Sequence, residues 1–114
     1  MRMVTIGAVQ MRCSENREEN IEKAEAFAEK AACEGANVIL LPELFERPYF
    51  CQERRYEYYS YAERTEDNLA VKRFSALARK LSAVIPVSFY EKDGNRLYNS
   101  LAMIDADGSL LGVY

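Results

Sequence analysis

Two apolar runs separated by one helical segment, all before residue 42, constrain the fold of this chain most. Residues 4–11 and 37–41 are rich in β-branched and aliphatic side chains, and the second run ends at Pro42, which cannot donate a hydrogen bond within a central sheet. A strand, a helix and a second strand in this order form a right-handed βαβ unit with parallel strands. We therefore expect an α/β fold in which strand 4–11 is central and covered on both faces.

The segment between the two runs carries the signals of a helix. Asn16 can cap a first turn, and Glu19 follows three residues later, as in a capping box. Gly35 suits the left-handed conformation that commonly ends a helix. Apolar side chains recur at helical spacing between them, at residues 21, 24, 27, 28, 31 and 32. These signals predict a helix over residues 17–34.

The remaining residues predict one more helix and three more strands. Asp67 or Asn68 can cap an amphipathic helix that covers the sheet, whereas residues 45–66, with five of the eight tyrosines, hold no period and predict a loop with a short helix. Asp93-Gly94 lies between apolar runs, which is typical of a hairpin. We expect the strands at residues 84–90, 98–104 and 109–114, with a second turn at 105–108.

Composition excludes several classes of function. The 114 residues suit a single domain and contain no histidine, so they hold no Ser-His-Asp or Cys-His pair and no histidine-ligated metal. The 15 basic and 18 acidic residues give a net charge of -3, without the basic surface that nucleic acid or an anionic membrane attracts. Three cysteines without CxxC spacing favour a reducing compartment. We expect a cytoplasmic protein with no metal, no nucleic-acid partner and no membrane partner.

Glu43 is the strongest candidate for a functional residue. It follows the apolar run 37–41 on a turn fixed by Pro42, and open α/β sheets bind ligands beyond the carboxyl ends of their strands. A carboxylate delivered there can act as a general base. The alternative, which holds for most single glutamates, is an acid at a strand end that points into water.

Three stretches of the sequence resemble the carbon-nitrogen hydrolases of the nitrilase superfamily. They are VTIGAVQM at residues 4–11, EGANVILLPELFERPYFCQ at 34–52 and VIPVSFYEKDGNRLYNSLAMIDADGSLLGVY at 84–114. The resemblance implies the N-terminal part of a four-layer αββα sandwich, and hydrolysis of an amide or carbamoyl carbon–nitrogen bond without a cofactor. Within the family, the similarity is greatest to the branch that acts on N-carbamoyl amines such as N-carbamoylputrescine. It further implies a homo-oligomer and a role in polyamine biosynthesis.

The resemblance also implies roles for individual residues. The family uses a Glu, a Lys and a Cys, and the Glu of its LPELF motif is Glu43 here. Tyr49 matches a position that contacts substrate, although an interfacial or core tyrosine is an equally plain interpretation. Asn99 matches a position that we expect to be structural, holding the turn into its strand. The Lys and Cys are expected after Tyr114, so residues 1–114 would be the N-terminal portion of one domain, truncated after Tyr114 and inactive alone.

None of the three cysteines is expected to be the nucleophile. Cys33 should lie in the core on the first helix, and Cys13 and Cys51 should be inert thiols in loops. The family nucleophile lies in a Cys-Trp motif, and this chain has no tryptophan. A hypothesis of a different class is a stand-alone α/β binding or interaction module that has lost catalysis. Arg-Lys directly after Tyr114 would favour truncation, and a stop codon there would favour the module.

Overall fold

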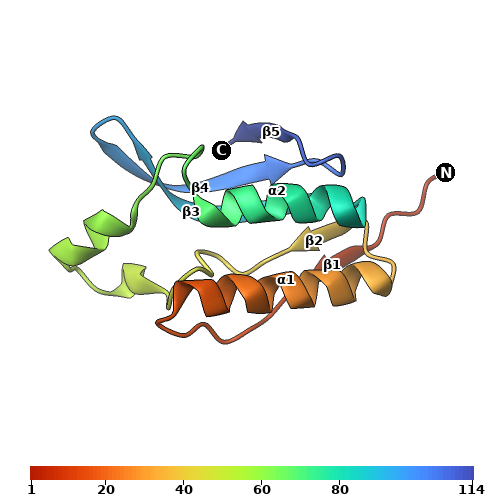
Figure 1. Cartoon of the computed structure of the whole chain (residues 1–114), viewed down its shortest axis with the longest axis horizontal. Helices are drawn as coiled ribbons and strands as arrows, with labels where there is room; N and C mark the ends of the chain where they lie inside the picture. The colour runs from red at the N-terminus through yellow and green to blue at the C-terminus, as the bar shows by residue number, and fades with distance from the viewer.

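Five strands form one layer of the computed structural model, which describes residues 1–114 (Figure 1). The first two pair in parallel and the last three pair antiparallel in chain order. The strands are β1 (Ile6–Ala8), β2 (Val38–Leu40), β3 (Ile85–Asp93), β4 (Arg96–Ile104) and β5 (Leu110–Val113). The parallel pairing of β1 and β2 around a helix confirms the expected βαβ unit and the α/β fold.

Two backbone hydrogen bonds join the parallel pair to the antiparallel strands. The Ile39 N–H donates to the Val84 carbonyl, and the Val84 N–H donates to the Asn37 carbonyl, each at a distance of 2.9 Å. β2 and the start of β3 therefore lie side by side, and the strand order is β1-β2-β3-β4-β5. The end of β2, where Glu43 follows, is thereby brought next to the long hairpin of β3 and β4.

Two helices, α1 (Arg17–Cys33) and α2 (Leu69–Leu81), cover the same face of this sheet (Figure 1). Both have the caps that the sequence indicates: the Asn16 side chain accepts from the Glu19 N–H at 3.1 Å, and the Asn68 side chain accepts from the Val71 N–H at 2.9 Å. Gly35 follows α1 with φ of +96°, as the sequence predicts. The loop between β2 and α2 contains two short 3₁₀ helices, at Phe50–Gln52 and Tyr56–Tyr61.

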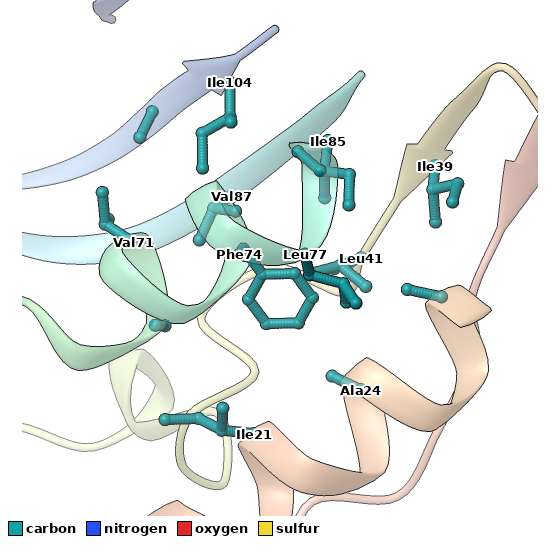
Figure 2. Close-up of a cluster of buried hydrophobic side chains, with 14 of the residues drawn as sticks. Ile21, Ala24, Ile39, Leu41, Val71, Phe74, Leu77, Ile85, Val87 and Ile104 are labelled. Carbon is teal, nitrogen blue, oxygen red and sulfur yellow. The ribbon is translucent and has the colours of Figure 1, made fainter. Parts of the chain in front are cut away.

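The core fills the space between the helices and the sheet (Figure 2). Ile85 and Val87 point to the helices because alternate residues of a strand share a face. Phe74 of α2 lies at the centre and meets Phe45 edge-on, with ring centroids 5.6 Å apart. Each fully buried side chain of this size contributes about 1.5–3 kcal/mol, so this one face supplies most of the apolar stabilisation.

The opposite face of the sheet carries no helix. Ile6 of β1 is 69% exposed and Leu40 of β2 is 47% exposed, although both are aliphatic residues within strands. Within residues 1–114, strand 4–11 is therefore neither central nor covered on both faces: β1 is an edge strand of three residues, and both helices lie on its other side. The uncovered face is the one that the Glu43 turn borders.

Other differences from the predicted elements are small. β3 and β4 continue through polar residues to the two-residue turn at Gly94 and Asn95, because the hairpin ladder pairs Asp93 with Arg96. Cys33 is exposed and not in the core, since Ala31 and Ala32 make the core contacts of the last turn of α1. Neither helix has the length and apolar character needed to cross a lipid bilayer.

Candidate functional site

The turn after β2 has a backbone conformation that the surrounding structure must hold in place. Leu44, directly after Glu43, has φ of +51°, a left-handed conformation that is unfavourable for a leucine. Its N–H donates to the Ser88 hydroxyl at 3.0 Å, and its side chain is buried. Such strain costs on the order of 1–3 kcal/mol and is found mostly at functional sites. The residue that it positions is Glu43.

The Glu43 side chain is exposed on the uncovered face of the sheet, and it is bound by Asn99 of β4. The Asn99 Nδ2 group donates to Glu43 Oε1 at 2.5 Å. Asn99 pairs with Tyr90 in the hairpin register, well inside the strand, so it does not hold the turn into β4 as we expected. Its side chain serves the glutamate instead.

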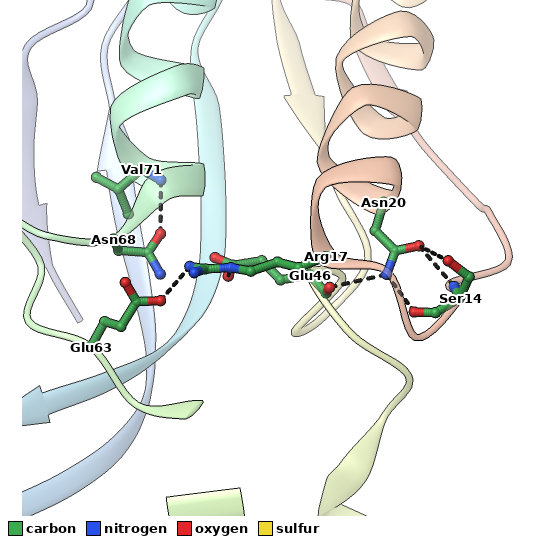
Figure 3. A network of polar contacts seen from close by, with 7 residues as sticks. All are labelled: Ser14, Arg17, Asn20, Glu46, Glu63, Asn68 and Val71. Atoms are coloured by element: carbon green, nitrogen blue, oxygen red, sulfur yellow. Dashed lines mark hydrogen bonds and ion pairs between the residues drawn. The ribbon is translucent and has the colours of Figure 1, made fainter. Parts of the chain in front are cut away.

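A set of ion pairs holds the other end of this turn to α1 (Figure 3). Arg17 Nε lies 2.6 Å from Glu46 Oε2, and the same guanidinium pairs with Glu63. The Asn20 side-chain amide donates to the Glu46 carbonyl at 3.0 Å. Burial alone would lower the pKa of Arg17, but the two carboxylates outweigh it and raise that pKa. The turn that carries Glu43 is thus fastened from both sides.

The position of Arg17 in the sequence is a signal for these ion pairs, although we did not predict them from it. Arg17 is the first residue of α1, where the positive end of the helix dipole disfavours a cation. A cation in that position indicates a carboxylate partner from elsewhere in the fold. Which carboxylate it would be is not apparent from sequence, because Glu46 and Glu63 lie far along the chain.

Glu43, Asn99 and Ser88 line an open hollow of about 330 Å³ on the uncovered face. The other lining residues are Leu40, Leu41, Ser100, Leu101 and Tyr114. None of them is a lysine or a cysteine. Within residues 1–114 the hollow therefore contains a base but neither a thiol nor an ammonium group, and the base alone cannot carry out acyl transfer.

Tyr49 lies near Glu43 but outside the lining of this hollow, and it is 45% exposed. The negative charge of Glu43 is the main cause that raises the pKa of Tyr49, and the neighbouring Cys51 adds to it. The hydroxyl of Tyr49 is thus within electrostatic reach of the glutamate. Its expected contact with substrate stays a prediction.

The tyrosine-rich loop forms a second, separate hollow of about 570 Å³. Phe50 packs against Tyr58 and Tyr90, with ring centroids 5.3 and 5.2 Å apart. Arg55 pairs with Glu53 at 2.8 Å, so charges of both signs cancel on this surface, as the sequence indicates. The aromatic rings pack on one another and give the loop a shape without regular strands.

All three cysteines are free thiols, and none lines the hollow at Glu43. Cys33 and Cys51 are exposed, and Cys13 is half-buried. Burial raises the pKa of Cys13, with Lys23 acting in the opposite direction, so this thiol is a weaker nucleophile at neutral pH. The side chains of the chain form no group of three acidic or thiol ligands that could hold a metal ion.

Comparison with known proteins gives consistent matches over almost the whole chain. Residues 5–114 match the family model for carbon-nitrogen hydrolase. The sequence is 45% identical over 111 residues to an N-carbamoylputrescine amidase of Oryza sativa subsp. japonica, covering 97% of this chain and 37% of that protein. It is 43% identical over 114 residues to a citrullinase of Francisella tularensis, covering 100% of this chain and 40% of that protein.

A solved structure agrees with the sequence matches. The fold is similar to that of a carbon-nitrogen hydrolase from Helicobacter pylori G27, with a TM-score of 0.87 and 29% identity. The similarity covers 97% of this chain and 38% of that one. The chain thus spans about two fifths of the length of the curated relatives that it matches.

Proposed function

The chain belongs to the carbon-nitrogen hydrolase family, and from this we propose that it is part of an enzyme that hydrolyses an N-carbamoyl amine by a Glu-Lys-Cys mechanism. The observation that supports the proposal most is the held carboxylate of Glu43, on the turn that follows β2 and beside an open hollow. A carboxylate in that place can exchange protons with a bound substrate.

The names of two relatives support the substrate class. N-carbamoylputrescine and citrulline both carry a carbamoyl group on an amine nitrogen, and the relatives named for acting on them are 45% and 43% identical to this chain. We propose N-carbamoylputrescine as the substrate, which would yield putrescine, carbon dioxide and ammonia.

In the proposed mechanism Glu43 moves protons at three steps. It takes the proton of the cysteine thiol as the sulfur attacks the carbonyl carbon, and an ammonium group stabilises the negative oxygen. Glu43 then donates this proton to the nitrogen as the carbon–nitrogen bond breaks, which leaves a thioester. Finally it takes a proton from the water that attacks the thioester, and it returns this proton to the sulfur as the carbon–sulfur bond breaks, which restores both the thiol and the carboxylate. The carbamic acid released decomposes to carbon dioxide and the remaining amine or ammonia.

The catalytic Lys and Cys are proposed to come from residues outside 1–114, because neither type lines the hollow at Glu43. Residues 1–114 alone should therefore be inactive. We also propose that Tyr49 contacts the substrate, since its hydroxyl is in electrostatic reach of Glu43. A homo-oligomeric assembly and a cytoplasmic location stay predictions.

Ammonia release by the full-length protein that contains residues 1–114 tests the function. We expect turnover of N-carbamoylputrescine and of citrulline, with the former preferred, and slow or no turnover of an ω-amide or a nitrile. Residues 1–114 assayed alone should release no ammonia above the uncatalysed rate. Turnover of neither carbamoyl amine by the folded full-length protein would contradict the proposal.

A further inference from the structure

Two side chains of the β3–β4 hairpin reach the Glu43 turn from the same sheet face. Ser88 of β3 accepts the Leu44 N–H at 3.0 Å, and Asn99 of β4 donates to Glu43 Oε1 at 2.5 Å. In the hairpin register Ser88 pairs with Leu101, and Tyr90 pairs with Asn99. The second pair lies two residues closer to the hairpin turn on each strand. Because side chains alternate along strands, Ser88 and Asn99 must project from one face. The hairpin therefore binds both the backbone and the carboxylate of the turn.

The two contacts differ in what they can contribute. Ser88 is buried and satisfies the N–H of a residue in a strained conformation, which is a structural task. Asn99 is exposed within residues 1–114, so in this chain water could replace its hydrogen bond to Glu43 at little cost in stability. The Asn99 hydrogen bond should thus contribute little to the stability of the fold, but it fixes the direction of the Glu43 carboxylate.

The hydrogen bond from Asn99 also makes the two oxygens of the Glu43 carboxylate different from each other. Oε1 accepts from Asn99, whereas Oε2 accepts no hydrogen bond from a group within residues 1–114. The hydrogen bond from Asn99 restricts rotation of the Glu43 side chain before the reaction begins. One oxygen is held and the other is left free for proton transfer. The negative charge of Glu43 in turn raises the pKa of the neighbouring Tyr49 hydroxyl, with a smaller effect from Cys51.

We propose that Asn99 is a positioning residue for the general base, which holds Glu43 Oε1 so that Oε2 is free to exchange protons. This inference rests on the proposed function, in which Glu43 is the base. Asn99 acts through Glu43 and is not required to touch the substrate. Its removal should therefore slow the chemical step and leave substrate binding nearly unchanged.

The test compares Asn99→Ala and Asn99→Asp with the matched control Asn95→Asp in the full-length protein, using N-carbamoylputrescine as substrate. Asn95 is an exposed asparagine in the turn of the same hairpin, and its side chain makes no contact with Glu43. Asn99→Ala should lower kcat about tenfold, the usual worth of one hydrogen bond to a charged group, and leave KM within about twofold. Asn99→Asp adds a negative charge at the same place, so the acid limb of the kcat/KM profile should move to higher pH. Asn95→Asp should change neither.

Melting curves and the Glu43→Gln variant separate the possible outcomes. If folded Asn99 variants keep the wild-type kcat and pH profile while Glu43→Gln is inactive, the positioning role is wrong and the proposed function stands. If Glu43→Gln is itself active, the proposed function fails. Loss of kcat in step with a lowered melting temperature in both Asn99 variants would show a structural role and overturn the inference. If one of these variants does not fold, Asn99→Ser takes its place, because serine keeps a short hydrogen-bond donor. Asn99→Ser should have a higher kcat than Asn99→Ala. A folded Asn99→Ser protein with no such recovery of kcat would contradict the proposal.

Discussion

At the scale of single residues, four side chains decide how the carboxylate of Glu43 lies. Ser88 and Asn99 hold the turn from the hairpin, and Arg17 and Asn20 hold its far end from α1. A carboxylate that follows a buried strand favours Glu43 as a site residue already in the sequence, and this assignment stays a prediction. Asn99 could not be assigned from sequence, since its role depends on the register that brings β4 beside the end of β2.

Ser88→Ala should destabilise the protein, because the Leu44 N–H would lose its partner in a buried environment. We expect a loss of about 1–3 kcal/mol in the free energy of unfolding, measured by denaturant titration of the full-length protein. Ser60→Ala serves as the control, since Ser60 lies in an exposed 3₁₀ helix and bonds only to a nearby carbonyl. Equal stability of the two variants would show that Ser88 does not support the turn.

The charge of Glu43 should be detectable at Tyr49. The carboxylate disfavours the tyrosinate form, so the pKa of Tyr49 lies above its usual value. Replacing Glu43 by Gln removes that charge, and the pKa of Tyr49 should fall toward the ordinary value. NMR titration of ring-labelled tyrosine measures it, with Tyr49→Phe identifying the resonance. An unchanged titration would mean that the two side chains do not interact.

Tyr49→Ala tests the substrate contact. If the ring lies against the substrate, KM should rise, or preference among carbamoyl amines of different length should change, while the melting temperature stays nearly constant because the side chain is 45% exposed. Steady-state kinetics and a melting curve measure the two effects. A variant that loses only stability would assign the tyrosine to structure.

At the scale of elements, local signals determine the helices and the hairpin, and long-range contacts determine the rest. Asn16 and Asn68 cap their helices, and Gly94 lies in the hairpin turn, as the sequence predicts. These features are predictable because each depends only on backbone groups a few residues away. The strand predicted at residues 4–11 is shorter in the structure, where β1 spans Ile6–Ala8. Its burial could not be predicted, because it depends on what packs against the uncovered face of the sheet. The Arg17 ion pairs depend likewise on segments that only the fold brings together.

Arg17→Ala should loosen the junction between α1 and the Glu43 turn. It leaves Glu46 and Glu63 without their shared cation, and the side chains involved are 13–27% exposed. A partly buried ion pair of this kind should be worth about 2 kcal/mol, less than a fully buried one because water screens it. Unfolding of the full-length protein by denaturant measures the loss, with the exposed Arg96→Ala as control. No difference between the two variants would mean that the ion pairs contribute nothing.

At the scale of the whole molecule, one sheet face is packed and the other is open. Val4, Ile6, Leu40 and Tyr114 are all exposed. Soluble monomers seldom expose contiguous apolar areas above a few hundred Å². Residues 1–114 in isolation should therefore aggregate or bind a hydrophobic dye strongly, as judged by sedimentation velocity and dye fluorescence. The doubly substituted Ile6→Lys, Leu40→Lys chain should aggregate less. A monodisperse, cooperatively melting monomer would instead favour the stand-alone binding module.

The proposed chemistry depends above all on Glu43 as the general base, and the turnover of Glu43→Gln tests it most directly. The full-length protein, Glu43→Gln and the control Glu22→Gln, an exposed glutamate of α1, are compared for ammonia release from N-carbamoylputrescine. The amide keeps the shape of the side chain but cannot take a proton, so kcat should fall by at least about 100-fold while KM and the melting temperature change little. Glu22→Gln should match the wild type. Near wild-type turnover by Glu43→Gln would contradict the role of Glu43 as the base.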